Sequence, residues 1–279
     1  MIELLKDEYP ITYMSRLLDI KKSSYYKWIK QGSPIANNYN EEHARIIEEE
    51  HYRLEQVYGV DRLRNEILQK RGINMNHKKV RRYLRLLGLS CIVRIKKPMK
   101  YIPDLRKRNH LNMAPNLINN NFKSDTPNKK LSTDVSYIKC TDGRLYLSAV
   151  KDLFNKEIIA YYVSDRNNDN LITKTIEQIS KGEGIIHSDQ GSLYFSKKYT
   201  KRVTKLGYKR SMSRKGACWE NSPIENWFSQ IKEERLRIDG LMSKTETRKA
   251  IKKYVRWYNN ERIQKALNYL SPIKYSLCF

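Results

Sequence analysis

Three acidic residues in the C-terminal half have side chains and surroundings suited to a shared metal site. Asp134 lies inside a strand-like run, Asp189 ends a later one, and Glu225 opens a helix-like run. Phosphoryl transfer between oxygens needs cations on the attacking and leaving oxygens, and two Mg²⁺ ions about 4 Å apart need carboxylates from several elements. We therefore interpret the three residues as one site for metal-dependent phosphoryl transfer.

Two of these carboxylates come from strands, and each has a structural alternative. Asp134 shares a strand face with Ser132 and Ser136, and aspartate is costly in a central strand unless it is paired or bound to a cation. The alternative is an aspartate hydrogen-bonded to a nearby loop. Asp189 follows the run GIIHS, at the carboxyl end of a strand, where open α/β sheets place ligands. Its alternative is an Asx turn before Gly191.

The third carboxylate belongs to a helix. Ser222, Pro223 and Glu225 form the pattern of a capping box with proline at the first helical position, which would explain Glu225 structurally. A polar stripe at spacings of four, four and three also runs beside the apolar face of this helix, where it can line a cleft. Its last member, Lys232, would hold a phosphate or a base edge. The stripe consists of Asn221, Glu225, Ser229 and Lys232.

The hydrophobic pattern after residue 130 predicts the elements that position these groups. Strand-like runs of period two come first and then alternate with helices, which predicts a mixed α/β sheet flanked by helices, in the order of a ribonuclease-H-like core. The expected elements are strands at 131–140, 144–154 and 156–165, a helix at 170–179, a strand at 184–189, a helix at 197–206, a basic segment at 208–216 and a helix from 223.

Before residue 93 the pattern is helical throughout. Residues 9–29 indicate two short helices of a helix-turn-helix-like unit, and residues 40–89 indicate three more. The last of these, at 77–89, has an apolar stripe and an otherwise cationic surface, typical of an element that contacts phosphates or enters a groove. A solvated basic face is the alternative. The cationic residues are Lys78, Lys79, Arg81, Arg82 and Arg85.

The charge of the whole chain points to a polyanionic partner. There are 55 Lys and Arg against 30 Asp and Glu, a net charge of +25, and nucleic acid is the commonest partner of such a chain, although a merely basic protein is the alternative. A basic tract at 94–109 and an Asn-rich stretch up to 130 together indicate a linker. The four cysteines and five histidines lack zinc-ligand spacing, and no apolar run reaches membrane-spanning length. We expect a cytoplasmic, nucleoid-associated protein with no membrane partner.

Four motifs in order and spacing carry a family resemblance, together with the 35 residues, 190–224, that separate Asp189 from Glu225. The chain resembles the DDE transposases and retroviral integrases, and within them the integrase-core subunit encoded by the second reading frame of two-frame bacterial insertion sequences. Residues 58–89 resemble the helix-turn-helix module of that group. The motifs are STDVSYI, IIHSDQGSLY, SMSRKGACWENSPIENWFSQIKEE and WYNNERIQKALNYLSPIKY.

The resemblance implies a DNA transposase, a polynucleotidyl transferase that cuts and joins DNA strands by two-metal phosphoryl transfer. It makes Asp134, Asp189 and Glu225 the catalytic metal ligands for two Mg²⁺ ions, with Mn²⁺ as a substitute, and Lys232 a DNA contact. It also implies a copy-out route through a circular intermediate, and a homo-oligomer in a synaptic complex with element ends and target DNA. The chain would be fused to, or act with, an upstream-frame helix-turn-helix protein.

The chain departs from the family pattern at few positions, and none is in the triad. Glu220 stands where many relatives have aspartate, Leu131 stands where an aromatic residue is usual, and the His/Cys zinc domain of retroviral integrases is absent. Three rival functions are a non-catalytic DNA-binding protein, a tyrosine recombinase, suggested only by the 20 tyrosines, and a simple ribonuclease H. The expected domains are a helix-turn-helix-like segment at 1–33, a helical DNA-binding region at 37–92, a basic linker at 93–130 and a ribonuclease-H-like integrase catalytic core at 131–279.

Overall fold

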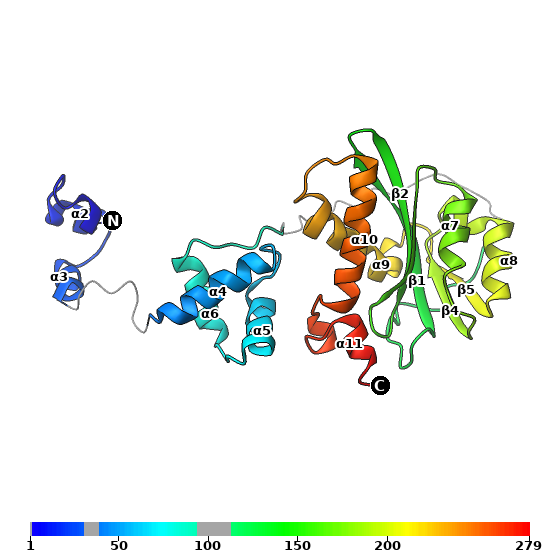
Figure 1. The fold of residues 1–279 in the computed structure, drawn as a ribbon, viewed down its shortest axis with the longest axis horizontal. Helices are drawn as coiled ribbons and strands as arrows, with labels where there is room; N and C mark the ends of the chain where they lie inside the picture. Colours follow the sequence, from blue (N-terminus) through cyan, green and yellow to red (C-terminus); the bar gives the residue numbers. More distant parts are fainter. Residues whose placement is uncertain (1, 31–38, 94–112) are drawn as a thin grey trace.

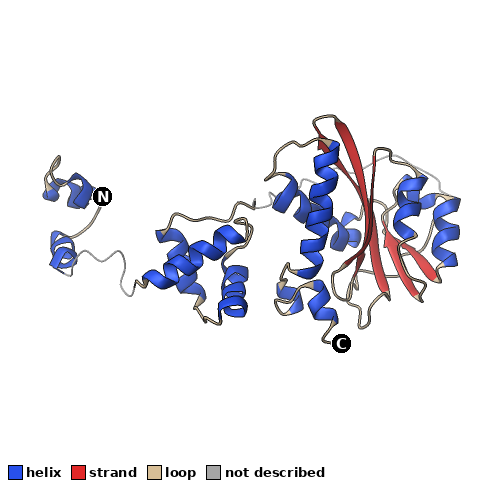
Figure 2. Cartoon of the chain, in the orientation of Figure 1, coloured by secondary structure: helices blue, strands red, loops and turns tan. Residues whose placement is uncertain are grey.

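The C-terminal part of the chain is built on one five-stranded sheet (Figures 1 and 2). The computed structural model describes residues 2–30, 39–93 and 113–279. The strands are β1 (Lys130–Cys140), β2 (Gly143–Asp152), β3 (Ile158–Ser164), β4 (Gly184–Ser188) and β5 (Tyr208–Met212). They lie in the order β3-β2-β1-β4-β5, with β1 antiparallel to β2 and parallel to β4. β2 and β3 pair antiparallel and β4 and β5 parallel, so the sheet is mixed, as predicted.

Helices cover both faces of this sheet because its strands alternate between two apolar sides. On one side Ile138 of β1 packs in a cluster with Trp227 and Tyr254, and on the other Leu131 packs with residues of the opposite helix pair. Among the described residues no helix is both long and apolar enough to cross a membrane. The first side is covered by α9 (Ser222–Ile231) and α10 (Lys244–Asn260), and the second by α7 (Asp169–Ile176) and α8 (Lys197–Lys205), as Figure 1 shows.

One strand was missing from the sequence prediction. Residues 208–216 were expected to form only a basic segment, yet Tyr208–Met212 forms β5 at the edge of the sheet. Tyr208 and Met212 are buried there, while Lys209 is exposed. The half-buried Arg210 lies between Tyr208 and Met212 in the sequence and packs over the Tyr199 ring. Together Lys209 and Arg210 interrupt the apolar alternation in the sequence, which is why the prediction was wrong.

Part of the expected linker lies along the part of the chain that contains the sheet. The basic tract at 94–109 is outside the described residues. From residue 113 onward the chain contacts the sheet: Ile118 is buried, Leu117 donates its backbone N–H to Ser211 at 2.9 Å, and Met212 donates its backbone N–H to Pro115 at 3.3 Å. These contacts hold the segment against β5 before the chain enters β1.

The region before it is a three-helix unit with its own apolar core, made of α4 (Glu41–Arg53), α5 (Val60–Arg71) and α6 (His77–Leu86). The side chains of Asn40 and Asn76 cap α4 and α6 by accepting backbone N–H bonds. Gly72 ends α5 in the left-handed conformation, with φ +69°. The fully buried side chains include Ile47, Leu63, Ile67, Val80 and Tyr83.

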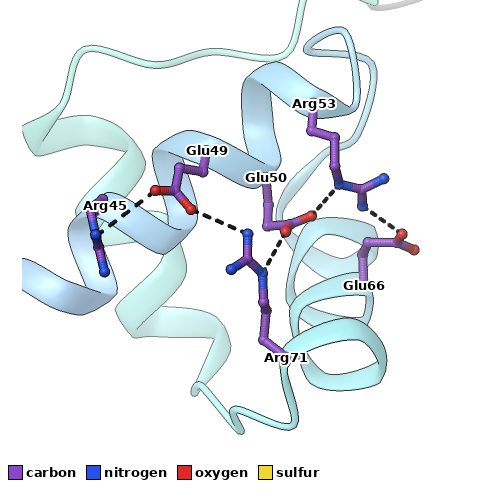
Figure 3. A network of polar contacts seen from close by, with 6 residues as sticks. All are labelled: Arg45, Glu49, Glu50, Arg53, Glu66 and Arg71. Carbon is purple, nitrogen blue, oxygen red and sulfur yellow. Dashed lines mark hydrogen bonds and ion pairs between the residues drawn. The ribbon is translucent and has the colours of Figure 1, made fainter.

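A network of ion pairs ties α4 to α5 (Figure 3). Glu50 is 2% exposed and accepts hydrogen bonds from Arg53 at 2.6 Å and Arg71 at 2.9 Å. Arg53 bridges on to Glu66 at 2.7 Å. Burial by itself raises the pKa of Glu50, but the two guanidinium groups outweigh it and lower that pKa. Every buried carboxylate in this network therefore has a cationic partner.

The first residues form a separate small cluster of helices. Its elements are α1 (Ile2–Leu5), α2 (Ile11–Leu17) and α3 (Lys22–Lys30). Ile2, Met14 and Tyr25 make its apolar centre, and the Tyr25 hydroxyl donates to Glu3 at 2.7 Å. The two helices predicted at 9–29 correspond to α2 and α3.

The three-helix unit packs against the sheet-containing part of the chain through the segment that follows α9. Trp257 and Ile263 join the apolar cluster of the three-helix unit, and the Ile263 backbone N–H donates to the Tyr58 hydroxyl at 3.1 Å. The remaining elements are the π-helical turn η3 (Lys232–Leu236), the 3₁₀ turns η1 (Ser192–Phe195), η2 (Cys218–Asn221) and η4 (Lys265–Leu267), and α11 (Pro272–Ser276).

Glu234 of η3 is the polar centre of this contact. It is 4% exposed, and its carboxylate accepts two hydrogen bonds from Arg262, at 2.8 and 2.6 Å, and one from Tyr254 at 2.9 Å. Arg62 of α5 lies 3.6 Å from the same carboxylate. Burial raises the pKa of Glu234, but these partners outweigh it and lower that pKa. A single buried carboxylate thus joins the two parts of the chain.

Replacing this carboxylate should destabilise the protein strongly. Glu234→Gln keeps the side-chain volume but leaves the buried Arg262 guanidinium without its counter-charge, so we expect a loss of about 3 kcal/mol in the free energy of unfolding. Urea unfolding followed by tryptophan fluorescence measures it. The matched control is Glu233→Gln, at the residue immediately before Glu234, which is partly exposed. Equal stability of the two variants would contradict the assignment.

Candidate active site

The first two carboxylates lie side by side because of the strand register. β1 and β4 are parallel neighbours in which Ser132 is level with His187. Asp134 is two residues beyond Ser132 and Asp189 is two residues beyond His187, so the two aspartates reach the same level at the carboxyl end of the pair. The register of the sheet therefore brings together residues that are far apart in the sequence.

Asp189 also forms the Asx turn that was its structural alternative. Its Oδ1 accepts the backbone N–H of Gly191 at 2.9 Å. A Cβ on Gly191 would lie 2.9 Å from that same oxygen, so a side chain at this position would displace the Asp189 carboxylate. Asp134 is held in a similar way, because its Oδ1 accepts the backbone N–H of Val135 at 2.7 Å. In both residues one hydrogen bond to the backbone fixes the direction of the carboxylate.

Glu225 is brought to the aspartates by α9, which is attached to β1 at both ends. At its start the Asn221 side chain accepts from the Ser132 hydroxyl at 2.7 Å and donates to the Thr133 carbonyl at 3.2 Å. Just past its end Lys232 donates to the Ser136 hydroxyl at 2.6 Å. These two attachments lie on either side of Asp134, so the polar stripe predicted from the sequence faces β1.

The predicted capping box is wrong. The N-cap of α9 is Asn221 rather than Ser222, no side-chain hydrogen bond caps the helix, and Ser222 already has helical dihedral angles. The physical reason is that the Asn221 side chain is used in the bonds to β1 and is fully buried there. A capping role therefore does not account for Glu225.

The electrostatics of the cleft show that the three carboxylates interact. Burial raises the pKa of Asp134 well above its usual value, and the charges of Asp189 and Glu225 raise it further. The backbone N–H of Val135 and the Lys232 ammonium oppose this effect. Burial also raises the pKa of Asp189. The cleft is thus a partly buried cluster of mutually repelling carboxylates.

Lys232 is the cation beside this cluster. Burial, followed by the charge of Arg237, lowers its pKa, while Asp134 raises it. Its Nζ also lies 5.3 Å from the centre of the exposed Tyr137 ring. The lysine predicted from the stripe therefore lies where it can meet a group entering the cleft from solvent.

The donor set fits hard divalent cations. Carboxylate oxygens are the preferred protein ligands of Mg²⁺, and a cation would remove the repulsion that raises the pKa of Asp134. Within the described ranges, no three His, Cys, Asp or Glu side chains converge closely enough to enclose an ion by themselves. A cleft of this kind suits ions that keep water or take oxygens of the substrate as further ligands.

Two buried residues near the cleft were not singled out from the sequence. Tyr194 lies 3.5 Å from the Thr133 hydroxyl, and burial followed by the charges of Asp134 and Asp189 raises the Tyr194 pKa well above its usual value. Lys151 of β2 donates to the Pro223 carbonyl at 3.1 Å, and burial lowers its pKa to about 7. The available signal was a lysine at an inward position of the run RLYLSAVKDLF.

The cationic residues predicted on α6 lie outside the carboxylate cleft. A hollow of about 450 Å³ on the helix surface is lined by four of them and Leu86. Arg81 also borders a second hollow of about 550 Å³, which it shares with Gln230 of α9 and Lys265. The cationic face of α6 therefore continues toward α9. The four are Lys78, Arg81, Arg82 and Arg85, and Lys79 lies over the Tyr83 ring.

Comparison with known proteins adds independent information. Two models of the integrase core domain match residues 124–218 and 206–272, and a model of an HTH-like domain matches residues 38–97. The chain is 33% identical to the putative transposase InsK of insertion sequence IS150 from Escherichia coli, over 97% of this chain and 95% of the relative.

Two further relatives cover less of the chain. An uncharacterized transposase-like protein of Haemophilus influenzae is 39% identical over 73% of this chain and 94% of its own length. The transposase of insertion sequence IS904 from Lactococcus lactis is 32% identical over 77% of this chain and 85% of its own length. The chain therefore belongs to the family of insertion-sequence transposases that carry an integrase core domain.

Proposed function

We propose that the protein is a DNA transposase of the DDE type, which cuts the ends of an insertion sequence and joins them to other DNA. The observation that supports this most is the cluster of Asp134, Asp189 and Glu225 on three separate elements of an integrase-type core. Such a cluster suits in-line displacement at phosphorus, a reaction that needs positioning and charge neutralisation rather than a covalent intermediate.

In this proposal the three carboxylates hold two Mg²⁺ ions, for which Mn²⁺ can substitute. Bound divalent cations supply the Lewis acidity that activates the attacking oxygen and stabilises charge on the leaving oxygen. The backbone bonds at Val135 and Gly191 orient the aspartates before substrate arrives. Lys232 leaves its Ser136 partner, or shares it, to hold a phosphate or base edge next to the reacting bond.

Strand transfer then follows from the same geometry. Attack of water on a phosphodiester at the element end would release a 3′ hydroxyl. That hydroxyl would then attack a second phosphodiester, forming a new phosphorus–oxygen bond while the 3′ oxygen of the attacked strand leaves. The helical region supplies sequence-independent affinity through α6, whose cations border the hollow shared with α9. Synapsis of two ends calls for more than one copy of the chain, with an upstream-frame helix-turn-helix protein as a fusion or a partner.

The rival functions predict different behaviour. A non-catalytic DNA-binding protein does not need three partly buried, mutually repelling carboxylates, and a simple ribonuclease H does not need the three-helix unit. A tyrosine recombinase would form a covalent phosphotyrosine bond with DNA. The family relationship and the carboxylate cluster together favour the transposase.

Removing the charge of Glu225 should abolish chemistry while leaving DNA binding intact. Glu225→Gln keeps the size of the side chain but removes a metal ligand, so we expect strand cleavage to fall by roughly 1,000-fold, equivalent to several kcal/mol. Cleavage of a labelled duplex carrying the element end in Mg²⁺ measures this. Glu233→Gln, two turns further on, is the matched control, and retained cleavage by Glu225→Gln would contradict the metal assignment.

Metal binding should be visible without any reaction. A cation relieves the repulsion around Asp134, so Mg²⁺ should raise the melting temperature of the wild type. At ten times its Kd, the ion should increase the free energy of unfolding by about 1.4 kcal/mol. Asp134→Asn should lose most of this increase. Asp125→Asn, at an exposed position, is the control. An increase in Asp134→Asn as large as in the wild type would place the metal elsewhere.

The role proposed for α6 can be tested by salt dependence. Lys78→Ala removes one phosphate contact, so the slope of log affinity against log salt concentration should decrease in magnitude by about 1. Filter binding to duplex DNA at several salt concentrations gives the slope. Lys252→Ala on α10 removes the same charge from another exposed position. An equal change in both variants would mean that α6 is not a specific contact.

A further inference from the structure

Trp219 is exposed to an unusual degree for its type. It lies in η2 with 55% of its surface accessible, whereas Trp227, eight residues later, is completely buried. In the described part of the chain no aromatic ring or cation stacks on the Trp219 indole. Single exposed apolar residues are common, so the exposure of Trp219 indicates a binding site only together with its position.

That position is two residues before a side chain that is bonded to β1 beside Asp134. Two residues after Trp219, Asn221 is bonded to Ser132 and Thr133, the residues just before Asp134 on β1. Glu225 follows four residues after Asn221, about one turn along α9. The backbone that carries the indole is therefore fixed directly to the strand that carries the first aspartate.

The loop in front of η2 holds the indole outward. The Glu220 carboxylate, 1% exposed, accepts the Arg214 backbone N–H at 2.6 Å and its Nε at 2.7 Å. The Ala217 backbone N–H closes a turn by donating to the Arg214 carbonyl at 3.1 Å. Because Ala217, Glu220 and Asn221 take the inward positions, Trp219 is left facing solvent.

The surroundings of the indole match nucleic acid better than protein. Arg214 keeps 70% of its side chain exposed while it binds Glu220, and Lys215 next to it is exposed. Aromatic rings interleaved with cations are typical of sites where unpaired bases stack. An indole that packs into a protein interface is usually surrounded by apolar residues, with charges depleted around it.

We propose that Trp219 is a stacking site for an unpaired nucleobase next to the phosphodiester that the carboxylates act on. The inference rests on the proposed function, because it takes DNA as the ligand. A base that leaves the duplex near the cut would lie on the indole, with Arg214 and Lys215 on the adjacent phosphates. Stacking of this kind tolerates any base, since every base has a flat aromatic face.

The test measures binding in Ca²⁺, where no cleavage needs to occur. Full-length protein is titrated with a labelled blunt duplex and with the same duplex carrying a short single-stranded thymidine overhang, of either polarity. The wild type should prefer an overhang, and Trp219→Ala should lose about 10-fold in affinity for that probe and little for the blunt one. Trp219→Phe should retain most of the preference. Leu241→Ala, another exposed apolar position, should behave as the wild type does.

A second measurement separates stacking from a structural effect. The overhang thymidines are replaced one at a time by abasic nucleotides. At one position the replacement should lower the affinity of the wild type and leave the affinity of Trp219→Ala unchanged. The two proteins should then bind that probe equally well. Equal binding of all probes by both proteins overturns the inference. A loss of self-association in Trp219→Ala also overturns it, because the indole would then contact a second copy of the chain. The proposed function fails separately, through retained cleavage by Glu225→Gln.

Discussion

Three carboxylates held close together in a partly buried cluster place the main constraint on this fold. Asp134 and Asp189 reach the same level on adjacent parallel strands, and Glu225 approaches from α9, so burial and mutual repulsion act together to raise the pKa of Asp134. Left to themselves, such groups would separate or become protonated. The fold prevents separation because Asp134 lies in a strand paired on both sides and α9 is attached to β1 on either side of it. The resulting repulsion between the carboxylates is the property that favours the binding of divalent cations there.

The attachment of α9 also connects this cleft to the helical region. From Lys232 onward the helix widens into the π-helical turn η3, a local change that is frequent at functional sites. Within that turn Lys232 points to Ser136 of β1, whereas Glu234 points to Arg262 and to Arg62 of the three-helix unit. The helix α9, which carries the proposed metal ligand Glu225, is thus continuous with the turn η3, which contacts α5. A displacement of the three-helix unit on DNA would be passed to α9 through the ion pair between Glu234 and Arg62.

Much of this arrangement could be predicted from the sequence, for reasons that differ between elements. The period-two runs and the helical stripes identified four of the five strands and most of the helices, because their apolar alternation is clear. β5 was missed because Lys209 and Arg210 stand between its two buried apolar residues in the sequence. The convergence of the aspartates could not be derived from spacing, since it depends on the register of β1 and β4. The bond from Lys151 to the start of α9 and the closed loop that presents Trp219 depend in the same way on tertiary contacts.

A structural explanation for a residue does not exclude a functional one, and Asp189 shows why. Its Asx turn to Gly191 is the alternative that the sequence suggested, and it is present. Yet an ionised carboxylate has two oxygens with about four lone-pair sites, and one backbone hydrogen bond uses only one of them. The same holds for Asp134 and its bond to Val135. The backbone bond limits the rotation of each carboxylate and so reduces the entropy lost when a ligand is bound. The turn that seemed to compete with the metal site is better understood as the device that orients it.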